Sequence, residues 1–192
     1  MKQVVRVVAV VALGLAALTA QPGCRRGGAY IWVQQQRYIP NLPAELQAYR
    51  DRPIYLGDFV NEAANTGTWY YYSPDQMVTY ETAPEVESYM RLCFAKAMST
   101  LGMVVLIDPP VTQDPTLPML TATIISWDDY AIHFQVVLTR YMQAVFQQEY
   151  RIEVQRIETV DPTILEDRAY RIMDMVVAGM LADPGFQSAF FQ

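Results

Sequence analysis

The sequence predicts an α+β fold, a two-layer sandwich in which two amphipathic helices pack on one face of a mostly antiparallel sheet of four or five strands. Three observations predict it. Residues 119–156 alternate apolar and polar side chains in successive segments, as expected for a half-buried antiparallel meander. Residues 82–101 and 163–182 instead place apolar side chains at helical spacing along one stripe. Each layer then has one apolar face, and packing the helices on the sheet buries both.

The first strand and the first helix are expected in the first half of the chain. Residues 54–60 form an apolar run rich in β-forming side chains. Residues 61–76, which contain Asn, Gly, Ser and Pro, then predict a long loop, a feature that often carries function. A capping box of Thr82 and Glu85 predicts the start of the helix, and Gly102 supplies the left-handed residue that ends it.

The second half of the chain contains the meander and the final helix. Residues 103–107 are uniformly apolar and are expected to form a strand buried on both faces. Three alternating strands follow, at residues 119–127, 130–140 and 145–156. Asp128 and Asp129 suit a hairpin turn between the first two strands, since aspartate tolerates left-handed geometry. Asp161-Pro162 and a second capping-box pattern, Thr163 with Glu166, predict the start of the last helix, and Asp183-Pro184-Gly185 predicts its end.

The N-terminus has the layout of an export signal. Lys2 and Arg6 precede an uninterrupted apolar run at residues 7–19. A helix of that length rises only about 20 Å, whereas the hydrocarbon core of a bilayer is about 30 Å thick. We therefore expect the segment to be removed rather than to span a membrane. Two cleavage positions compete: ordinary signal peptidase after Ala20, and lipoprotein processing before Cys24.

The residues before Cys24 favour the second position. They resemble the lipobox of bacterial lipoproteins, in which a small residue such as Gly23 precedes a cysteine that is diacylated on sulfur and becomes the new N-terminus. Gln21 and Pro22 depart from that pattern, which has an apolar and then a small residue. The chain has only one other cysteine, so a disulfide framework does not explain Cys24, and we expect it to be lipidated. The expected organisation is a signal peptide at 1–23, a lipidated tether at 24–50 and one α+β domain at 51–192.

The composition argues against several functional classes. With 14 basic and 20 acidic side chains, the chain is a poor match for nucleic acid, which is bound by clustered Lys and Arg. His133 is the only histidine, so neither a histidine-based triad nor a multi-histidine metal site is expected. We expect His133 on the polar sheet face, and Asp167, Arg171 and Asp174 on the solvent side of the last helix. No phosphate loop, nucleophile elbow, paired CxxC or EF-hand spacing occurs, so we expect no cofactor, no metal and no enzymatic activity.

A run of aromatic residues is the candidate partner-binding site. It comprises Trp69, Tyr70, Tyr71 and Tyr72, within the predicted loop. If the run is extended, alternate side chains point to opposite faces, so some of them face outward. Aromatic side chains are enriched at partner interfaces. The alternative is an edge strand whose outward tyrosines pack on their own loop.

Sulfur-containing side chains suggest a second candidate function. Cys93 lies on the apolar stripe of the first helix and is expected to be a small buried hydrophobic residue. Six methionines share such positions, namely Met90, Met98, Met103, Met173, Met175 and Met180. Methionine either fills gaps in a core or lines an adaptable apolar cavity. The second reading would make the protein a periplasmic lipid or small-molecule carrier.

The order of these features resembles that of small bacterial envelope lipoproteins. The resemblance covers a lipobox-like Cys24, a strand containing Gly57-Asp58-Phe59, a helix ending in Leu101-Gly102-Met103, a meander and a long C-terminal helix. Two kinds of protein share this order: the auxiliary lipoproteins of ABC-type transport systems, and the lipoprotein of lipopolysaccharide assembly.

This resemblance implies a membrane-anchored, non-enzymatic accessory or docking subunit of an envelope transport or assembly complex. Its partners would be the membrane, through the lipid, and an envelope protein. Arg25 follows Cys24 in place of the aspartate that retains many such lipoproteins at the inner membrane. The outer membrane, with the domain facing the periplasm, is therefore the expected location, and the inner membrane is the alternative.

Overall fold

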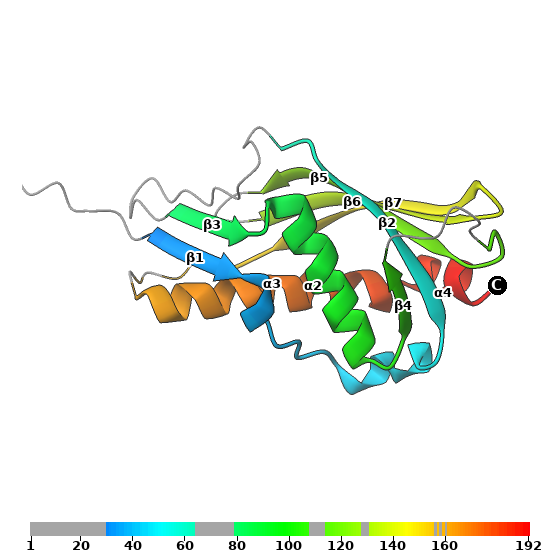
Figure 1. Cartoon of the computed structure of the whole chain (residues 1–192), viewed down its shortest axis with the longest axis horizontal. Helices are drawn as coiled ribbons and strands as arrows, with labels where there is room; N and C mark the ends of the chain where they lie inside the picture. Colours follow the sequence, from blue (N-terminus) through cyan, green and yellow to red (C-terminus); the bar gives the residue numbers. More distant parts are fainter. Residues whose placement is uncertain are drawn as a thin grey trace, which may run out of the picture.

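The computed structural model describes residues 30–63, 79–107, 114–127, 131–155, 157, 159 and 161–192. The elements, in chain order, are β1 (Tyr30–Gln34), η1 (Gln35–Arg37), η2 (Ala44–Tyr49), β2 (Pro53–Asn61), β3 (Thr79–Ala83), α2 (Val86–Thr100), β4 (Val104–Ile107), β5 (Met119–Trp127), β6 (Ala131–Arg140), β7 (Gln143–Glu153), α3 (Pro162–Ala182) and α4 (Pro184–Phe191). Figure 1 shows the five-stranded sheet as one layer, with α2 and α3 packed against it.

The five-stranded sheet has the order β4-β2-β5-β6-β7. Its longest pairings, β5 with β6 and β6 with β7, are antiparallel, whereas β2 runs parallel to both β4 and β5. The α+β sandwich predicted from the sequence is thereby confirmed, as are the three alternating strands of the meander. Inward side chains such as Phe134, Val136 and Leu138 are fully buried, and the outward residues between them are polar or half-buried.

A second, two-stranded sheet was not predicted. In it β1 pairs with β3 in parallel, from Tyr30 opposite Thr79 to Gln34 opposite Ala83. Val33, Tyr38 and Tyr49 are buried in the core, so residues 30–50 belong to the folded domain rather than to the tether expected there. The paired strands lie far apart in the chain, and no periodic pattern of apolar residues within either segment predicts that they pair.

Neither predicted capping box forms, although the predicted start of the last helix at Asp161-Pro162 is confirmed. Thr82 is buried in β3, where its backbone pairs with β1, so it cannot cap the helix. Helix α2 begins only at Val86, and its N-cap residue makes no side-chain capping hydrogen bond. At α3 the cap is Asp161, whose carboxylate accepts a 2.9 Å hydrogen bond from the backbone N–H of Thr163. Pro162 occupies the first helical position, where its missing N–H costs nothing. The end of α2 is as predicted, with Gly102 at a φ of 83°.

Strand β4 lies at an edge of the sheet instead of in its interior. Among the described strands, β4 pairs with β2 alone. Val104 and Ile107 are exposed, so the prediction that this strand is buried on both faces is wrong. An apolar run alone does not distinguish a central strand from an edge strand, because pairing with a second strand depends on segments elsewhere in the chain.

Asp174 departs from the predicted solvent face of the last helix. Its carboxylate accepts hydrogen bonds from the Tyr38 hydroxyl at 2.7 Å and from the backbone N–H of Asn41 at 3.1 Å. Asp174 thus fastens the N-terminal segment to α3. The neighbouring Asp167 and Arg171 do form the expected surface pair, at 3.7 Å. Of the helices described, none combines the length and the apolarity needed to cross a bilayer.

Candidate functional site

Both sites predicted from the sequence lie outside the described residues. This applies to the lipidation site Cys24, to the aromatic run Trp69, Tyr70, Tyr71 and Tyr72, and also to the predicted Asp128-Asp129 turn. These assignments stay predictions. Among the described residues, a different group of side chains forms the candidate site.

The described domain has two distinct ends. In Figure 1, β1 begins at the left end of the longest axis, and the β6–β7 hairpin and α4 lie at the right end. We call the right end the distal end, because residues 24–29, the part of the predicted tether that precedes the described domain, lead into β1. Its surface is formed by the hairpin tip Tyr141-Met142, by Val145, and by a pocket at the end of α4.

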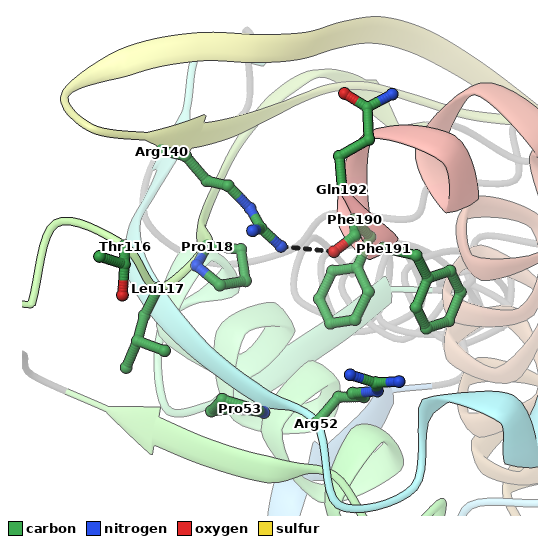
Figure 2. Close-up of a pocket in the computed structure, with 9 residues that line it drawn as sticks. All are labelled: Arg52, Pro53, Thr116, Leu117, Pro118, Arg140, Phe190, Phe191 and Gln192. Atoms are coloured by element: carbon green, nitrogen blue, oxygen red, sulfur yellow. Dashed lines mark hydrogen bonds between the residues drawn. The ribbon is translucent and has the colours of Figure 1, made fainter.

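The pocket at the distal end is assembled from four separate segments. They are the start of β2, the residues before β5, the end of β6 and the end of α4 (Figure 2). Its volume is about 220 Å³. The lining residues are Arg52, Pro53, Thr116, Leu117, Pro118, Arg140, Phe190, Phe191 and Gln192. Two guanidinium groups and two phenyl rings, with no Asp or Glu side chain among the lining residues, suit a partner that presents carboxylate or carbonyl oxygens beside an apolar group.

The two arginines of the pocket are held by α4. A terminal nitrogen of Arg140 donates a hydrogen bond to the carbonyl oxygen of Phe190, drawn as a dashed line in Figure 2. The guanidinium carbon of Arg52 lies 5.7 Å from the centroid of the Phe191 ring, a cation–π distance. The Nε atom of Arg140 is buried and has no hydrogen-bond partner in the described structure. Each guanidinium group has five donors, so both can bind a further acceptor.

Helix α4 is fixed by a cap and an aromatic cluster. The Asp183 carboxylate accepts hydrogen bonds from the backbone N–H groups of Gly185 at 2.7 Å and Phe186 at 3.0 Å. A Cβ atom at Gly185 would lie 3.1 Å from the Phe146 ring and 3.0 Å from the capping carboxylate, so a larger residue would require these side chains to shift by a few tenths of an ångström. The ring of Tyr49 lies 5.1 Å from that of Phe190, centroid to centroid. The pocket wall is therefore rigidly attached to the core.

The hairpin tip has residue types that are unusual for its backbone conformation. Arg140 pairs with Gln143, which leaves a two-residue turn in which Tyr141 and Met142 have φ values of 50° and 61°. Turns with two positive φ values strongly prefer Asn-Gly, because a side-chain Cβ clashes in the left-handed region. Yet two large side chains occupy these positions, and they are 65% and 93% exposed. The backbone N–H of Tyr141 donates a 2.7 Å hydrogen bond to the Pro115 carbonyl, which holds the tip beside the pocket.

The local conformation of the tip is costly and its side chains contribute little to the fold. Residues held in the left-handed region cost of the order of 1–3 kcal/mol each, and such strain clusters at functional sites. Exposed apolar side chains gain little free energy from folding. We therefore regard the distal surface, defined as Tyr141, Met142, Val145 and the pocket, as the candidate contact site.

His133 lies on the outward face of the sheet, as predicted, but it has a partner that the sequence did not indicate. Its Nε2 atom is 3.0 Å from a carboxylate oxygen of Glu149 on the adjacent strand. A histidine–carboxylate pair is a component of acid–base sites. Here it lies on a sheet face, and neither of its members lines the distal pocket.

The sulfur-containing side chains fill the core. Cys93 is fully buried, as predicted, and burial raises the pKa of its thiol to about 12. Five of the six methionines are buried members of the continuous core: Met90, Met98, Met103, Met173 and Met180. Met175 is exposed instead. This distribution favours the gap-filling interpretation over an apolar cavity lined by methionine.

A second groove lies between the N-terminal segment and α3. It has a volume of about 330 Å³. Several of its polar groups bind one another: Arg37 lies 2.9 Å from a Glu166 carboxylate oxygen, and the Tyr170 hydroxyl lies 2.7 Å from the same side chain. This groove is therefore mainly a polar seam that fastens residues 35–41 to the helix. No group of three or more potential metal ligands occurs in the part of the chain that the structure describes.

Comparison with known proteins identifies the fold. Neither a scan against protein-family models nor a search of curated proteins gives a match. Among solved structures, the chain is similar to the crystal structure of protein XCC0632 from Xanthomonas campestris, of the family DUF330. The TM-score is 0.51 at 10% sequence identity, over 79% of this chain and 92% of that one. What the two chains share is the fold. The similar structure comes from a bacterium.

Proposed function

We propose that the protein is a membrane-anchored lipoprotein, a non-enzymatic accessory or docking subunit of a cell-envelope transport or assembly complex. The observation that carries the docking role is the exposed Tyr141-Met142 tip, which uses large apolar side chains where the backbone favours Asn-Gly. The anchoring role rests on Cys24, which follows an export signal and resembles a lipobox cysteine. The bacterial origin of the similar fold is compatible with this environment.

The lipid and the distal surface would act together. Acyl chains on Cys24 would confine the domain to the plane of a membrane, most simply the outer membrane, with the domain in the periplasm. Confinement raises the effective concentration of a partner in the same membrane and strengthens a weak contact without any new interaction. The tether joins at the β1 end of the domain, which leaves the distal surface at the opposite end of the long axis accessible (Figure 1).

The distal surface has the composition of a contact site. Interfaces are enriched in aromatic residues, methionine and arginine, and their hot spots are often arginine or aromatic residues. Tyr141 and Met142 would insert into an apolar recess of an envelope protein. Arg52 and Arg140 would bind carboxylate or carbonyl oxygens beside that recess, since they lie next to the Phe190 and Phe191 rings.

Site-specific photo-crosslinking in intact cells tests this function. A photoreactive amino acid replaces Met142 at the tip, and in a matched control it replaces Gln147, which is exposed on β7. We expect Met142 to give one discrete crosslinked species with a membrane or envelope protein, and Gln147 to give none. The crosslink should be lost when Cys24 is replaced by Ser. Equal crosslinking from both positions, or none from either, would contradict docking through the distal surface.

A further inference from the structure

The two-stranded sheet has an exposed aromatic face. Ile31 and Val33 of β1 point into the core and are buried, whereas Tyr30 and Trp32 point away from it. The outward pair is 54% and 56% exposed. Both side chains stand on one strand, two residues apart, so they lie on the same face. A tyrosine and a tryptophan with more than half of their surface in water form an apolar patch with polar tips.

This face lies next to the predicted anchor along the chain. Tyr30 is the sixth residue after Cys24. A fully extended chain spans at most about 3.5 Å per residue, so Tyr30 lies within about 20 Å of the Cys24 sulfur whatever path the chain takes. The radius of gyration of a domain of this size is about 15 Å, so the connection is too short to hold the domain far from the surface.

We propose that the outward face of β1, formed by Tyr30 and Trp32, binds the headgroup region of the membrane that holds the acyl chains. This inference rests on the proposed lipidation of Cys24. Tryptophan and tyrosine are the side chains enriched at membrane–water interfaces, because their rings enter the apolar boundary while the N–H or O–H group stays hydrated. The lipid brings this face to the bilayer, and the two rings then fix which side of the domain faces it.

The charges around the face indicate which lipids are needed. Trp32 is opposite the half-exposed Glu81 of β3 in the register of the sheet. Arg37, at the end of η1, has a largely exposed side chain, although it also pairs with Glu166. The segment that carries the rings thus has charges of both signs, Glu81 across the sheet and Arg37 five residues after Trp32 in the chain, and we expect interfacial binding to zwitterionic as well as anionic headgroups. Binding through the rings should accordingly survive high salt, which screens surface charge.

The same face serves neither the core nor the distal surface. Its two rings take part in none of the aromatic pairs described for the domain, and β1, which carries them, lies toward the opposite end of the longest axis from α4 (Figure 1). Membrane contact through β1 therefore leaves the Tyr141-Met142 tip free to meet a protein. The domain would bind two different surfaces with its two ends.

Tryptophan fluorescence in reconstituted vesicles tests the proposal. The lipidated full chain is purified from membranes and placed in phosphatidylcholine vesicles, with or without bromine on the acyl chains as a short-range quencher. Two variants are compared, Trp69→Phe, which keeps Trp32 and Trp127, and Trp69→Phe with Trp32→Phe, which keeps only Trp127. Trp127 is buried and serves as the internal reference. Since Trp32 is exposed, its replacement should leave the melting temperature unchanged.

We expect brominated lipid to reduce the emission of the Trp32-containing variant and to leave the Trp127-only variant unchanged. Quenching should be stronger for bromine near the carbonyl end of the acyl chain than for bromine near the methyl end, and it should persist at high salt. Equal emission of the first variant in both kinds of vesicle would overturn the proposal. So would protection of Trp32 from aqueous iodide in a lipid-free, concentrated Cys24→Ser chain, because a second copy would then cover the face.

The mass of the purified chain separates this proposal from the one on which it rests. Acyl mass on Cys24 together with unquenched Trp32 would overturn the membrane-facing role of β1 and leave the lipoprotein function intact. A chain without acyl mass would contradict the lipoprotein function itself. In that case quenching of Trp32 by vesicles would still support membrane binding by the aromatic face.

Discussion

Replacing the hairpin tip Tyr141-Met142 with Asn-Gly should stabilise the domain and abolish its proposed contact. The two residues adopt φ values of 50° and 61°, which L-residues with large side chains seldom occupy. Asn tolerates this region and Gly is unrestricted in it, so the substituted turn is the one that two-residue hairpins prefer. Strained functional sites commonly trade stability for activity, and a gain in stability here would mark the tip as such a site.

The expected gain in the free energy of unfolding follows from the two φ angles. A residue with a Cβ in the left-handed region loses roughly 1–2 kcal/mol, so relief at two positions is worth about 2 kcal/mol after the small loss of side-chain packing. The side chains are 65% and 93% exposed, which keeps that loss small. For a domain of this size, about 2 kcal/mol corresponds to a rise in melting temperature of roughly 4–8 °C.

Urea and thermal denaturation of the Cys24→Ser chain measure the effect, because this variant cannot be acylated. The matched control is Tyr141→Ala with Met142→Ala, which removes the side chains but keeps a Cβ at both positions. The control should therefore retain most of the strain and gain little stability, yet it should lose the photo-crosslink as completely as the Asn-Gly variant does. An Asn-Gly variant no more stable than the parent would refute the strained-tip reasoning, and a retained crosslink would refute the contact.

Four further predictions concern the groups that hold the domain together. Arg140→Leu removes the donor to the Phe190 carbonyl and should lower the free energy of unfolding by about 1.5–3 kcal/mol in urea; an unchanged value would show that the hydrogen bond does not hold α4. Asp183→Ala removes the N-cap of α4 and should cost about 1 kcal/mol, whereas Asp183→Asn, which keeps an acceptor, should cost much less. The Cys93 thiol, buried and with its pKa raised to about 12, should not react with a thiol reagent at neutral pH in the folded Cys24→Ser chain, and prompt reaction would contradict its burial. Burial raises the pKa of the Asp174 carboxyl above its usual value of 3.8, so between the two pKa values the carboxyl is protonated in the folded state and ionised in the unfolded state. The raised pKa therefore stabilises the fold fully below pH 3.8, and this stabilisation is lost as pH rises through the folded pKa. Asp174→Asn should flatten this part of the pH–stability curve.

The parts of the fold that were predicted correctly are those whose signal is local. Strands β5, β6 and β7 alternate apolar and polar residues because one face of each packs against the core, only partly buried in β7, and consecutive strands pair with one another. Gly102 marks the end of α2 for an equally local reason, its positive φ. The pairing of β1 with β3 has no such signal, since 44 residues separate the two strands in the chain, among them β2 and two short helices.

Two errors came from motifs that fit more than one structure. Thr82 and Glu85 have the spacing of a capping box, but pairing with β1 draws Thr82 into a strand and moves the start of the helix to Val86. The Asp-Pro-Gly sequence after α3 was interpreted only as a stop. It also begins α4, with Asp183 as N-cap and Pro184 in the first turn.

The distal pocket could not be predicted from the sequence. Its lining comes from four segments that only the tertiary structure brings together, and neither Arg52-Pro53 nor Phe190-Phe191 forms a recognised motif. The hairpin tip could have been identified. Tyr141 and Met142 stand between two alternating strands where turn-forming residues are expected, and large apolar residues there are a sign of function.

Intact-mass analysis of the mature protein from native membranes tests whether Cys24 anchors the domain to a membrane. We expect a chain that begins at Cys24, carries the mass of its acyl chains, and loses both that mass and its membrane retention when Cys24 is replaced by Ser. An unmodified chain that begins at Gln21 would contradict anchoring through Cys24, because the protein would then be an exported domain without a lipid anchor.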